Sequence, residues 1–318
     1  MTEQEQHPNC DVMGVLLMAY GTPEKPEDIE PYYTHIRRGN PPPEHLLREL
    51  QERYELVGGQ TPLTAITEAT RRGLEERLNA AGEGRYRVVM GMKHWTPWIH
   101  EAVAQLAAEG IGRAVGLVLA PHYSTYSIMQ YYDYVQEAKE QLGLDLEIER
   151  IDSWHLHPPY LNAVARRVRE RLAELPPGEE VTVVFTAHSL PEKIVAAGDP
   201  YPEQLRETAE TLARMLSLRH WTFSYQSAGR TADPWLGPDL VDTVVRLADE
   251  GVTNILVATI GFVSDHLEIL YDIDYEAKAA AEERGVRLTR TDSLNASPDF
   301  LEGLADLVRS RVKEPAHG

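Results

Sequence analysis

The sequence predicts an α/β protein made of two similar, doubly wound lobes of the Rossmann-like type, each with a parallel sheet. Three observations support this. Apolar runs of strand length alternate with segments of helical periodicity along most of the chain. Polar or aromatic residues follow the apolar runs, where open α/β sheets place their sites. The alternation also occurs twice, and the second series starts after Pro158 and Pro159. Two such lobes facing each other would form a cleft between their strand ends.

The first half contains four strand-like runs. The run 12–19, VMGVLLMA, is continuously apolar, as expected for a buried parallel strand, and it ends at Tyr20 and the turn Gly21-Thr22-Pro23. Further strands are predicted at 85–92, 114–119 and 146–150, and helices at 27–38, 43–55, 64–81, 97–109 and 126–141.

The second half repeats the pattern. Strands are predicted at 181–187, 221–226, 254–260 and 286–290, and helices at 159–174, 201–216, 239–250, 264–276 and 298–313. We therefore expect residues 1–10 to form a disordered tail, residues 11–155 the N-terminal lobe and residues 156–297 the C-terminal lobe. The last helix, 298–313, is expected to complete the N-terminal lobe.

Composition excludes several kinds of protein. The net charge of −19 over 318 residues argues against nucleic acid or an anionic membrane as partner, and it is compatible with a cationic substrate such as a metal ion. The single cysteine, Cys10, excludes an internal disulfide and a cysteine-bound iron–sulfur cluster. Residues 1–10 lack the features of a signal peptide, and no apolar run approaches 18 residues. We expect a cytoplasmic protein and, without a heptad pattern, a monomer.

Common nucleotide and hydrolase motifs are missing. The sequence has neither GxGxxG after its first strand nor GxxxxGK[ST], and Ser189 lacks the GxSxG setting. Dinucleotide binding, P-loop chemistry and α/β-hydrolase chemistry are therefore not indicated.

An acidic row follows the strand 254–260. On a regular helix, Glu268, Asp272 and Glu276 are spaced i, i+4 and i+8, so their carboxylates would lie on one face. The default interpretation is a solvated acidic face. The position just past a strand end favours a cation site instead. A π-bulge in this helix would change the direction of the carboxylates, and spacing does not show whether one is present.

Other candidate residues lie at strand ends and at one helix end. Tyr20, His122, His188 and His266 each follow an apolar run closely. A structural role is sufficient for each alone. Arg37 and Arg38 end a helix before Gly39, which is itself a common helix stop. Together with Arg53 and Tyr54, however, they would form a donor-rich patch for anions.

This combination indicates a type of chemistry. Neutral imidazole is a good ligand for Fe²⁺, and a neighbouring carboxylate can share the metal or accept protons. Further acids one turn apart can pass on cations or protons in steps. With an aromatic residue and arginines opposite, the pattern fits a flat, apolar anion that receives a metal.

The sequence resembles the ferrochelatases. The resemblance runs in order through nearly the whole chain and is carried by LLMAYGTP (16–23), YYTHIRRG (32–39), ERYELVGGQTPL (52–63), LAPHYSTYS (119–127), AHSLPEKI (187–194), DPYPEQL (199–205), DPWLGPD (233–239) and GFVSDHLEILYDIDYE (261–276). It is greatest to the bacterial type without an iron–sulfur cluster, which acts on coproporphyrin III.

The resemblance implies a chelatase fold, with two four-stranded parallel sheets facing across a porphyrin cleft. It implies a lyase of haem biosynthesis that inserts Fe²⁺, as substrate, into a macrocycle bent in that cleft, with no resident cofactor. His188 would be the metal-binding and catalytic histidine and Glu268 its acidic partner, while Asp272 and Glu276 continue an acidic path. Tyr20 would be an axial contact to the product iron. Arg37, Arg53, Tyr54, Thr61 and Tyr131, with Arg38 at the rim, would hold propionates; Thr61 stands where the family more often has serine.

Alternatives remain open at this point. The substrate could be protoporphyrin IX, or the reaction could be cobalt insertion into sirohydrochlorin, whose chelatases have a related fold. A haem carrier would use Tyr20 but has no use for three carboxylates in a row. Transient contact with the next haem-pathway enzyme is expected, and insertion into a membrane is not.

Overall fold

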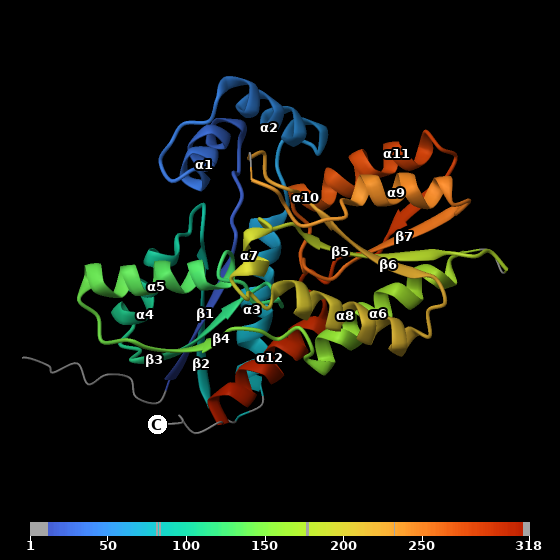
Figure 1. Ribbon diagram of the computed structural model, residues 1–318. Coiled ribbons are helices and arrows are strands. Elements are labelled where there is room, and N and C mark those ends of the chain that lie inside the picture. The colour runs from blue at the N-terminus through green and yellow to red at the C-terminus, as the bar shows by residue number, and fades with distance from the viewer. Residues whose placement is uncertain (1–11, 81, 83, 176–177, 232, 314–318) are drawn as a thin grey trace, which may run out of the picture.

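The computed structural model describes residues 12–80, 82, 84–175, 178–231 and 233–313. The expected tail at 1–10 lies outside this part of the chain. Two four-stranded sheets form the framework, and every paired strand is parallel, as predicted (Figure 1). Among the described residues, no helix is both long and apolar enough to cross a membrane.

The two sheets have the same strand order. The first runs β2-β1-β3-β4 and the second β6-β5-β7-β8, so β1 and β5 occupy equivalent inner positions. The strands are β1 (Val12–Ala19), β2 (Arg85–Met92), β3 (Arg113–Val118), β4 (Glu147–Ile151), β5 (Thr182–His188), β6 (Trp221–Gln226), β7 (Asn254–Thr259) and β8 (Arg287–Arg290).

Helices cover both faces of each sheet. They are α1 (Ile29–Ile36), preceded by a 3₁₀ turn (Pro26–Asp28), α2 (Glu44–Leu56), α3 (Leu63–Ala80), α4 (Ile99–Ala108), α5 (Ile128–Leu142), α6 (Pro158–Ala173), α7 (Lys193–Ala196), α8 (Tyr201–Leu216), α9 (Leu240–Asp249), α10 (Leu267–Leu270), a π-helical segment (Asp272–Ala277), α11 (Lys278–Glu282) and α12 (Pro298–Lys313). The short helix α7 was not predicted.

The inner faces of the two sheets share one hydrophobic core. A single cluster of buried side chains includes Leu17 of β1, Leu74 of α3, Phe185 of β5 and Leu304 of α12. The helix α12 packs against α3, α6 and β3, between the two halves (Figure 1). The outer faces have separate cores, under α4 and α5 in the first half and under α9 and α11 in the second. Whether the halves are separate folding domains stays a prediction.

The acidic helix differs from the prediction. It begins at Leu267 rather than near 264, and the α-helix stops after four residues. The carbonyl of Tyr271 accepts hydrogen bonds from the amides of both Tyr275 and Glu276, at 3.0 Å each, which starts a π-helical turn. This turn holds one more residue than an α turn. The prediction of three carboxylates on one face was therefore wrong for Glu276, which is exposed, while Asp272 is only 5% exposed.

Candidate active site

One cluster lies after the second inner strand. His188 is the last residue of β5, and its Nε2 lies 3.5 Å from Oε1 of Glu268, in the first turn of α10. Oε2 of Glu268 lies 3.3 Å from Nε2 of His266, whose Nδ1 contacts the carbonyl of Ser264. We call His188, His266, Glu268 and Asp272 the histidine–carboxylate cluster. The sequence prediction that His188 and Glu268 lie together is thus met in space.

Charge and burial oppose each other at His188 and Glu268. Burial alone would lower the pKa of His188, but the charge of Glu268 and the hydrogen bonds to Glu268 and the Ser189 carbonyl raise it above the ordinary histidine value. Burial alone would raise the pKa of Glu268, yet His188 and His266 hold it well below its usual range. His188 and Glu268 therefore each stabilise the charged form of the other.

Asp272 behaves differently from Glu268, although it lies only one turn further on. Burial and the charge of Glu268 raise the pKa of Asp272 to about 7. The hydroxyl of Ser227 donates to its Oδ2, and Nη1 of Arg53 lies 3.5 Å from its Oδ1. Glu276 is exposed, but its charge still raises the pKa of Asp272. Asp272 thus titrates near neutral pH between Glu268, which is half-buried, and Glu276, which is exposed.

A second cluster follows the first inner strand. Tyr20 comes directly after β1, is 40% exposed, and packs its ring 4.6 Å from the ring of His94. Nζ of Lys93 lies 5.9 Å from the Tyr20 ring and 5.1 Å from the Tyr131 ring, and donates to Gln130. We call Tyr20, Lys93, His94 and Tyr131 the tyrosine cluster. Lys93 and His94 follow β2 directly, and this position at a strand end was a signal in the sequence for a site residue.

Charge from the second half affects the tyrosines of the first. Burial raises the pKa of Tyr131 well above the ordinary tyrosine value, and partial burial of the Tyr20 side chain raises its pKa in the same direction. The charge of Glu268 raises both further. The approach of the two strand ends across a cleft stays a prediction.

The predicted propionate contacts do not form one group, and Tyr131 belongs to the tyrosine cluster. Arg37 caps α1, Arg38 is exposed after it, and neither has an ion pair with a carboxylate of the described residues. Tyr54 and Thr61 are buried, and their hydroxyls both contact Oγ1 of Thr22, at 3.1 and 2.9 Å. Arg53 binds Glu49 and Asp272.

His122 follows the strand β3, as the sequence indicated, but it is buried. It is 2% exposed, its Nε2 contacts Oγ1 of Thr208 on α8 at 2.9 Å, and burial lowers its pKa. Its role is to join the two halves. Next to it, the Tyr201 hydroxyl donates to the His188 carbonyl at 2.9 Å. Sequence reasoning gave no role to Tyr201, because a hydrogen bond to a distant carbonyl leaves no pattern.

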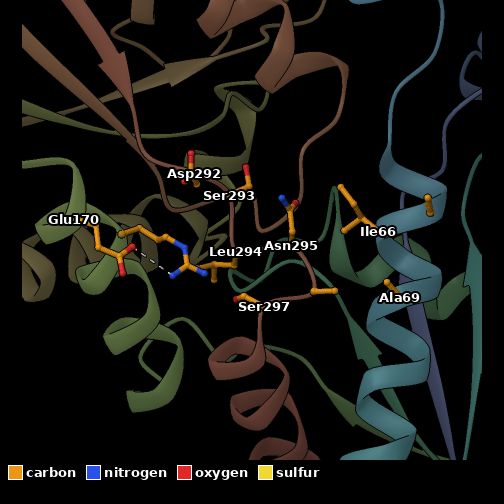
Figure 2. A pocket seen from close by; sticks show the side chains of 11 residues that line it. Ile66, Ala69, Glu170, Asp292, Ser293, Leu294, Asn295 and Ser297 are labelled. Atoms are coloured by element: carbon orange, nitrogen blue, oxygen red, sulfur yellow. Dashed lines mark ion pairs between the residues drawn. The ribbon is translucent and has the colours of Figure 1, made fainter. Parts of the chain in front are cut away.

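The site is distinct from the cavity shown in Figure 2. That cavity has a volume of about 540 Å³ and lies between α3, α6 and the loop that leads into α12. Ile66, Ala69, Glu170 and Leu294 are among its lining residues, and no predicted site residue is. Within the described part of the chain, no three His, Cys, Asp or Glu side chains are grouped so as to hold a metal ion by themselves.

The fold is that of known chelatases. The sirohydrochlorin chelatase SirB from Bacillus subtilis subspecies spizizenii, solved in complex with cobalt, superposes with a TM-score of 0.57 at 10% identity, covering 95% of this chain and 96% of that one. The siroheme enzyme CbiX superposes with a TM-score of 0.53 at 12% identity, covering 93% and 98%. Two parallel sheets of equal order, with imidazole and carboxylates at a strand end, thus define a chelatase-type α/β protein.

Sequence comparison narrows the class. The sequence model of the ferrochelatase family matches residues 12–312. A ferrochelatase of Herpetosiphon aurantiacus is 46% identical over 296 residues, covering 92% of this chain and 97% of that protein. A coproporphyrin III ferrochelatase of Geobacillus kaustophilus is 46% identical over 305 residues, covering 95% and 96%. The chain belongs to the ferrochelatase family.

Proposed function

We propose that this chain inserts Fe²⁺ into coproporphyrin III and releases Fe-coproporphyrin III. The observation that carries the proposal is the His188–Glu268 pair, with Nε2 and Oε1 3.5 Å apart at the end of the inner strand β5. Several relatives bear the name coproporphyrin III ferrochelatase, which supports the choice of substrate. Fe²⁺ is a substrate in this scheme, and no resident cofactor takes part.

Metal delivery uses the histidine–carboxylate cluster. A neutral His188 and an ionised Glu268 offer one nitrogen and one oxygen donor to Fe²⁺. Two donors hold the ion weakly, so the four pyrrole nitrogens can take it over. Two N–H protons leave the macrocycle as the metal enters. The raised pKa of His188 supports its role as a proton acceptor, because Glu268 stabilises the imidazolium that forms.

Protons then leave along the acidic path. Asp272, with a pKa of about 7, can gain and lose a proton near neutral pH. Glu276 lies exposed beyond it. We propose that these two carboxylates connect Glu268 to solvent.

Binding of the macrocycle uses the opposite side. Tyr20 would lie against the face remote from His188 and become an axial contact to the product iron. Contacts away from the metal would bend the macrocycle, at a strain of about 1–5 kcal/mol, and so expose the pyrrole nitrogens.

Substrate choice depends on carboxylate contacts. Coproporphyrin carries four propionates and protoporphyrin two. Each charge-assisted hydrogen bond contributes about 1.5–3 kcal/mol. Arg37, Arg38 and Arg53 supply positive charge in a protein of net negative charge, and Tyr54, Thr61 and Tyr131 lie on the same half. This number of donors suits four carboxylates better than two.

The decisive test is anaerobic Fe²⁺ insertion, followed by visible absorption, with coproporphyrin III and protoporphyrin IX side by side. We expect turnover on coproporphyrin III with the higher kcat/KM. Preference for protoporphyrin IX would overturn the substrate while keeping the reaction. Tight haem binding without any insertion would instead identify a haem carrier.

A further inference from the structure

Glu49, on α2, binds two arginines from different halves of the molecule. Its Oε1 accepts a hydrogen bond from Nη2 of Arg53, one turn later on α2, at 2.9 Å. The same oxygen accepts from Nη2 of Arg230, in the loop between β6 and α9. Arg53 in turn lies 3.5 Å from Asp272. We call Arg230, Glu49, Arg53 and Asp272 the Glu49 ion-pair network.

The network attaches α2 to the second half of the molecule. The Arg53 guanidinium also lies over the Tyr271 ring, 4.6 Å from its centre, and the Tyr275 hydroxyl donates to the Leu56 carbonyl at 2.6 Å. In Figure 1, α2 accordingly lies at the same end of the molecule as α10. The carboxylates of Glu49 and Asp272 therefore already pair with the Arg53 guanidinium, which the family resemblance assigns to a substrate propionate.

The loop that carries Arg230 is held beside His188. Gly229 lies against the Trp235 ring so closely that a Cβ there would come within 2.2 Å of it. The Trp235 indole N–H donates to Thr231 at 2.8 Å, and its ring centre lies 6.4 Å from that of His188. Arg230 thus has a defined position near the histidine–carboxylate cluster, although its side chain is 58% exposed.

Glu49, which joins the two arginines, has the same chemical groups as the propionates of the proposed substrate. A glutamate side chain is two methylenes and a carboxylate, as is a porphyrin propionate. A guanidinium binds either in the same fork geometry. A propionate that reaches Arg53 and Arg230 can therefore replace Glu49 without leaving either guanidinium unpaired. A vinyl group at the same place cannot replace it.

We propose that Arg230 is a further propionate contact and that Glu49 is its internal competitor. In the free protein Glu49 neutralises both arginines. A coproporphyrin propionate displaces it, whereas protoporphyrin, with vinyl groups in two positions, leaves it in place. Arg230 then raises the preference for coproporphyrin and Glu49 lowers it. This inference rests on the proposed function, because it concerns how that site selects its porphyrin.

The test measures binding and turnover separately. Kd of each metal-free porphyrin is measured from its fluorescence, and KM and kcat from metal insertion, for wild type, Arg230→Gln, Glu49→Gln and the double variant. Arg230→Gln is expected to weaken coproporphyrin binding about fivefold, typical of one half-exposed charged contact, and protoporphyrin binding less than about twofold. Glu49→Gln is expected to tighten coproporphyrin binding about threefold. The gain from Glu49→Gln should shrink when Arg230 is also replaced.

Arg113→Gln is the matched control. Arg113 is similarly exposed and also binds two glutamates, but it lies at the first residue of β3, the end of that strand opposite the site. It should leave both Kd values unchanged. Three results would each overturn the inference and leave the network as a structural attachment of α2. The first two are an equal loss of binding for both porphyrins in Arg230→Gln and no loss of binding at all in that variant. The third is weaker coproporphyrin binding in Glu49→Gln. A wild type that binds but does not insert metal would instead reject the proposed function, while the Kd ratios still decide the role of Arg230.

Discussion

The two halves of the molecule have the same sheet order but opposite chemistry after their inner strands. The first inner strand, β1, leads to Tyr20, whose ring packs against that of His94 and has Nζ of Lys93 5.9 Å from its centre. The second, β5, ends at His188, which is paired with a carboxylate. One framework thus supplies two sites after equivalent strands, and the residues at the strand ends decide what each contributes. We infer that the first half grips the macrocycle and the second performs the reaction.

The largest expected effect is on kcat, and it is tested by comparing His188→Ala with Tyr20→Phe. Loss of the histidine should lower kcat by about 10²–10⁴, the usual contribution of a general acid–base residue. Tyr20→Phe keeps the ring and should lower kcat less than about tenfold. Both are measured by anaerobic Fe²⁺ insertion, with porphyrin Kd as the binding control. A greater loss in Tyr20→Phe would reverse the assignment of the two halves.

The pH dependence of insertion tests the second half alone. Below its pKa, His188 carries a proton and has no lone pair for Fe²⁺. Since the pKa of His188 is raised, the acid limb of kcat/KM should lie above the ordinary histidine value of about 6.5 and fall about tenfold per pH unit. Glu268→Gln removes the charge that raises this pKa, so the limb should move to lower pH.

Porphyrin Kd measured over the same range separates this limb from titration of the substrate. A wild-type profile that stays flat from pH 5 to 8, at constant Kd, would exclude His188 as ligand and proton acceptor.

The two carboxylates one turn apart should affect stability in opposite directions. The folded pKa of Asp272, about 7, is above its ordinary value of 3.8, so the wild type loses stability as pH rises from about 4 to 7. Asp272→Asn should therefore stabilise the fold at pH 8, on the order of 2 kcal/mol, and have little effect at pH 4. The pKa of Glu268 is lowered, so its ionised form stabilises the fold at neutral pH, and Glu268→Gln should destabilise it there.

Urea unfolding at pH 4 and pH 8 measures both changes. If Asp272→Asn were destabilising at pH 8, the contacts with Arg53 and Ser227 would outweigh the burial of the charge.

The smallest expected effect on kcat is tested by comparing two buried tyrosines. The Tyr201 hydroxyl donates to the His188 carbonyl at 2.9 Å, and the Tyr132 hydroxyl donates to the Gly116 carbonyl at 2.8 Å. Replacing either by phenylalanine should cost about 1–2 kcal/mol of stability, because a buried carbonyl loses a donor. Only Tyr201→Phe should also lower kcat, about threefold with KM unchanged, since only Tyr201 positions the histidine.

Thermal unfolding and steady-state kinetics measure these changes. Equal kcat values for the two variants would reduce Tyr201 to a structural residue.

The framework was predictable because it depends on local apolar runs. The strands Val12–Ala19, Arg85–Met92 and Trp221–Gln226 begin and end where the sequence indicated. Parallel strands that are buried on both faces have continuously hydrophobic sequences, and turn residues mark their ends. For the same reason, His188 and Tyr20 could be placed at strand ends before their partners were known.

The rest of the site depends on backbone irregularity and long-range pairing. The π turn at Tyr271 moves Glu276 out of the carboxylate row, and periodicity alone assumes a regular helix. His122 has the same sequence setting as His188, yet it is buried against Thr208 because α8 packs over it. Arg230 pairs with Glu49 across 181 positions, so no local pattern predicts the contact.

The core shared by the two sheets sets the mechanics of binding. Side chains from β1, α3, β5 and α12 belong to one continuous buried cluster, so a hinge motion between the halves would have to separate packed side chains. Close-packed interiors have low compressibility. When two elastic bodies are pressed together, the softer one takes most of the deformation. The spacing between the halves should therefore stay constant from the free protein to the complex, and a tetrapyrrole, whose ring puckers readily, should adapt its shape to the protein.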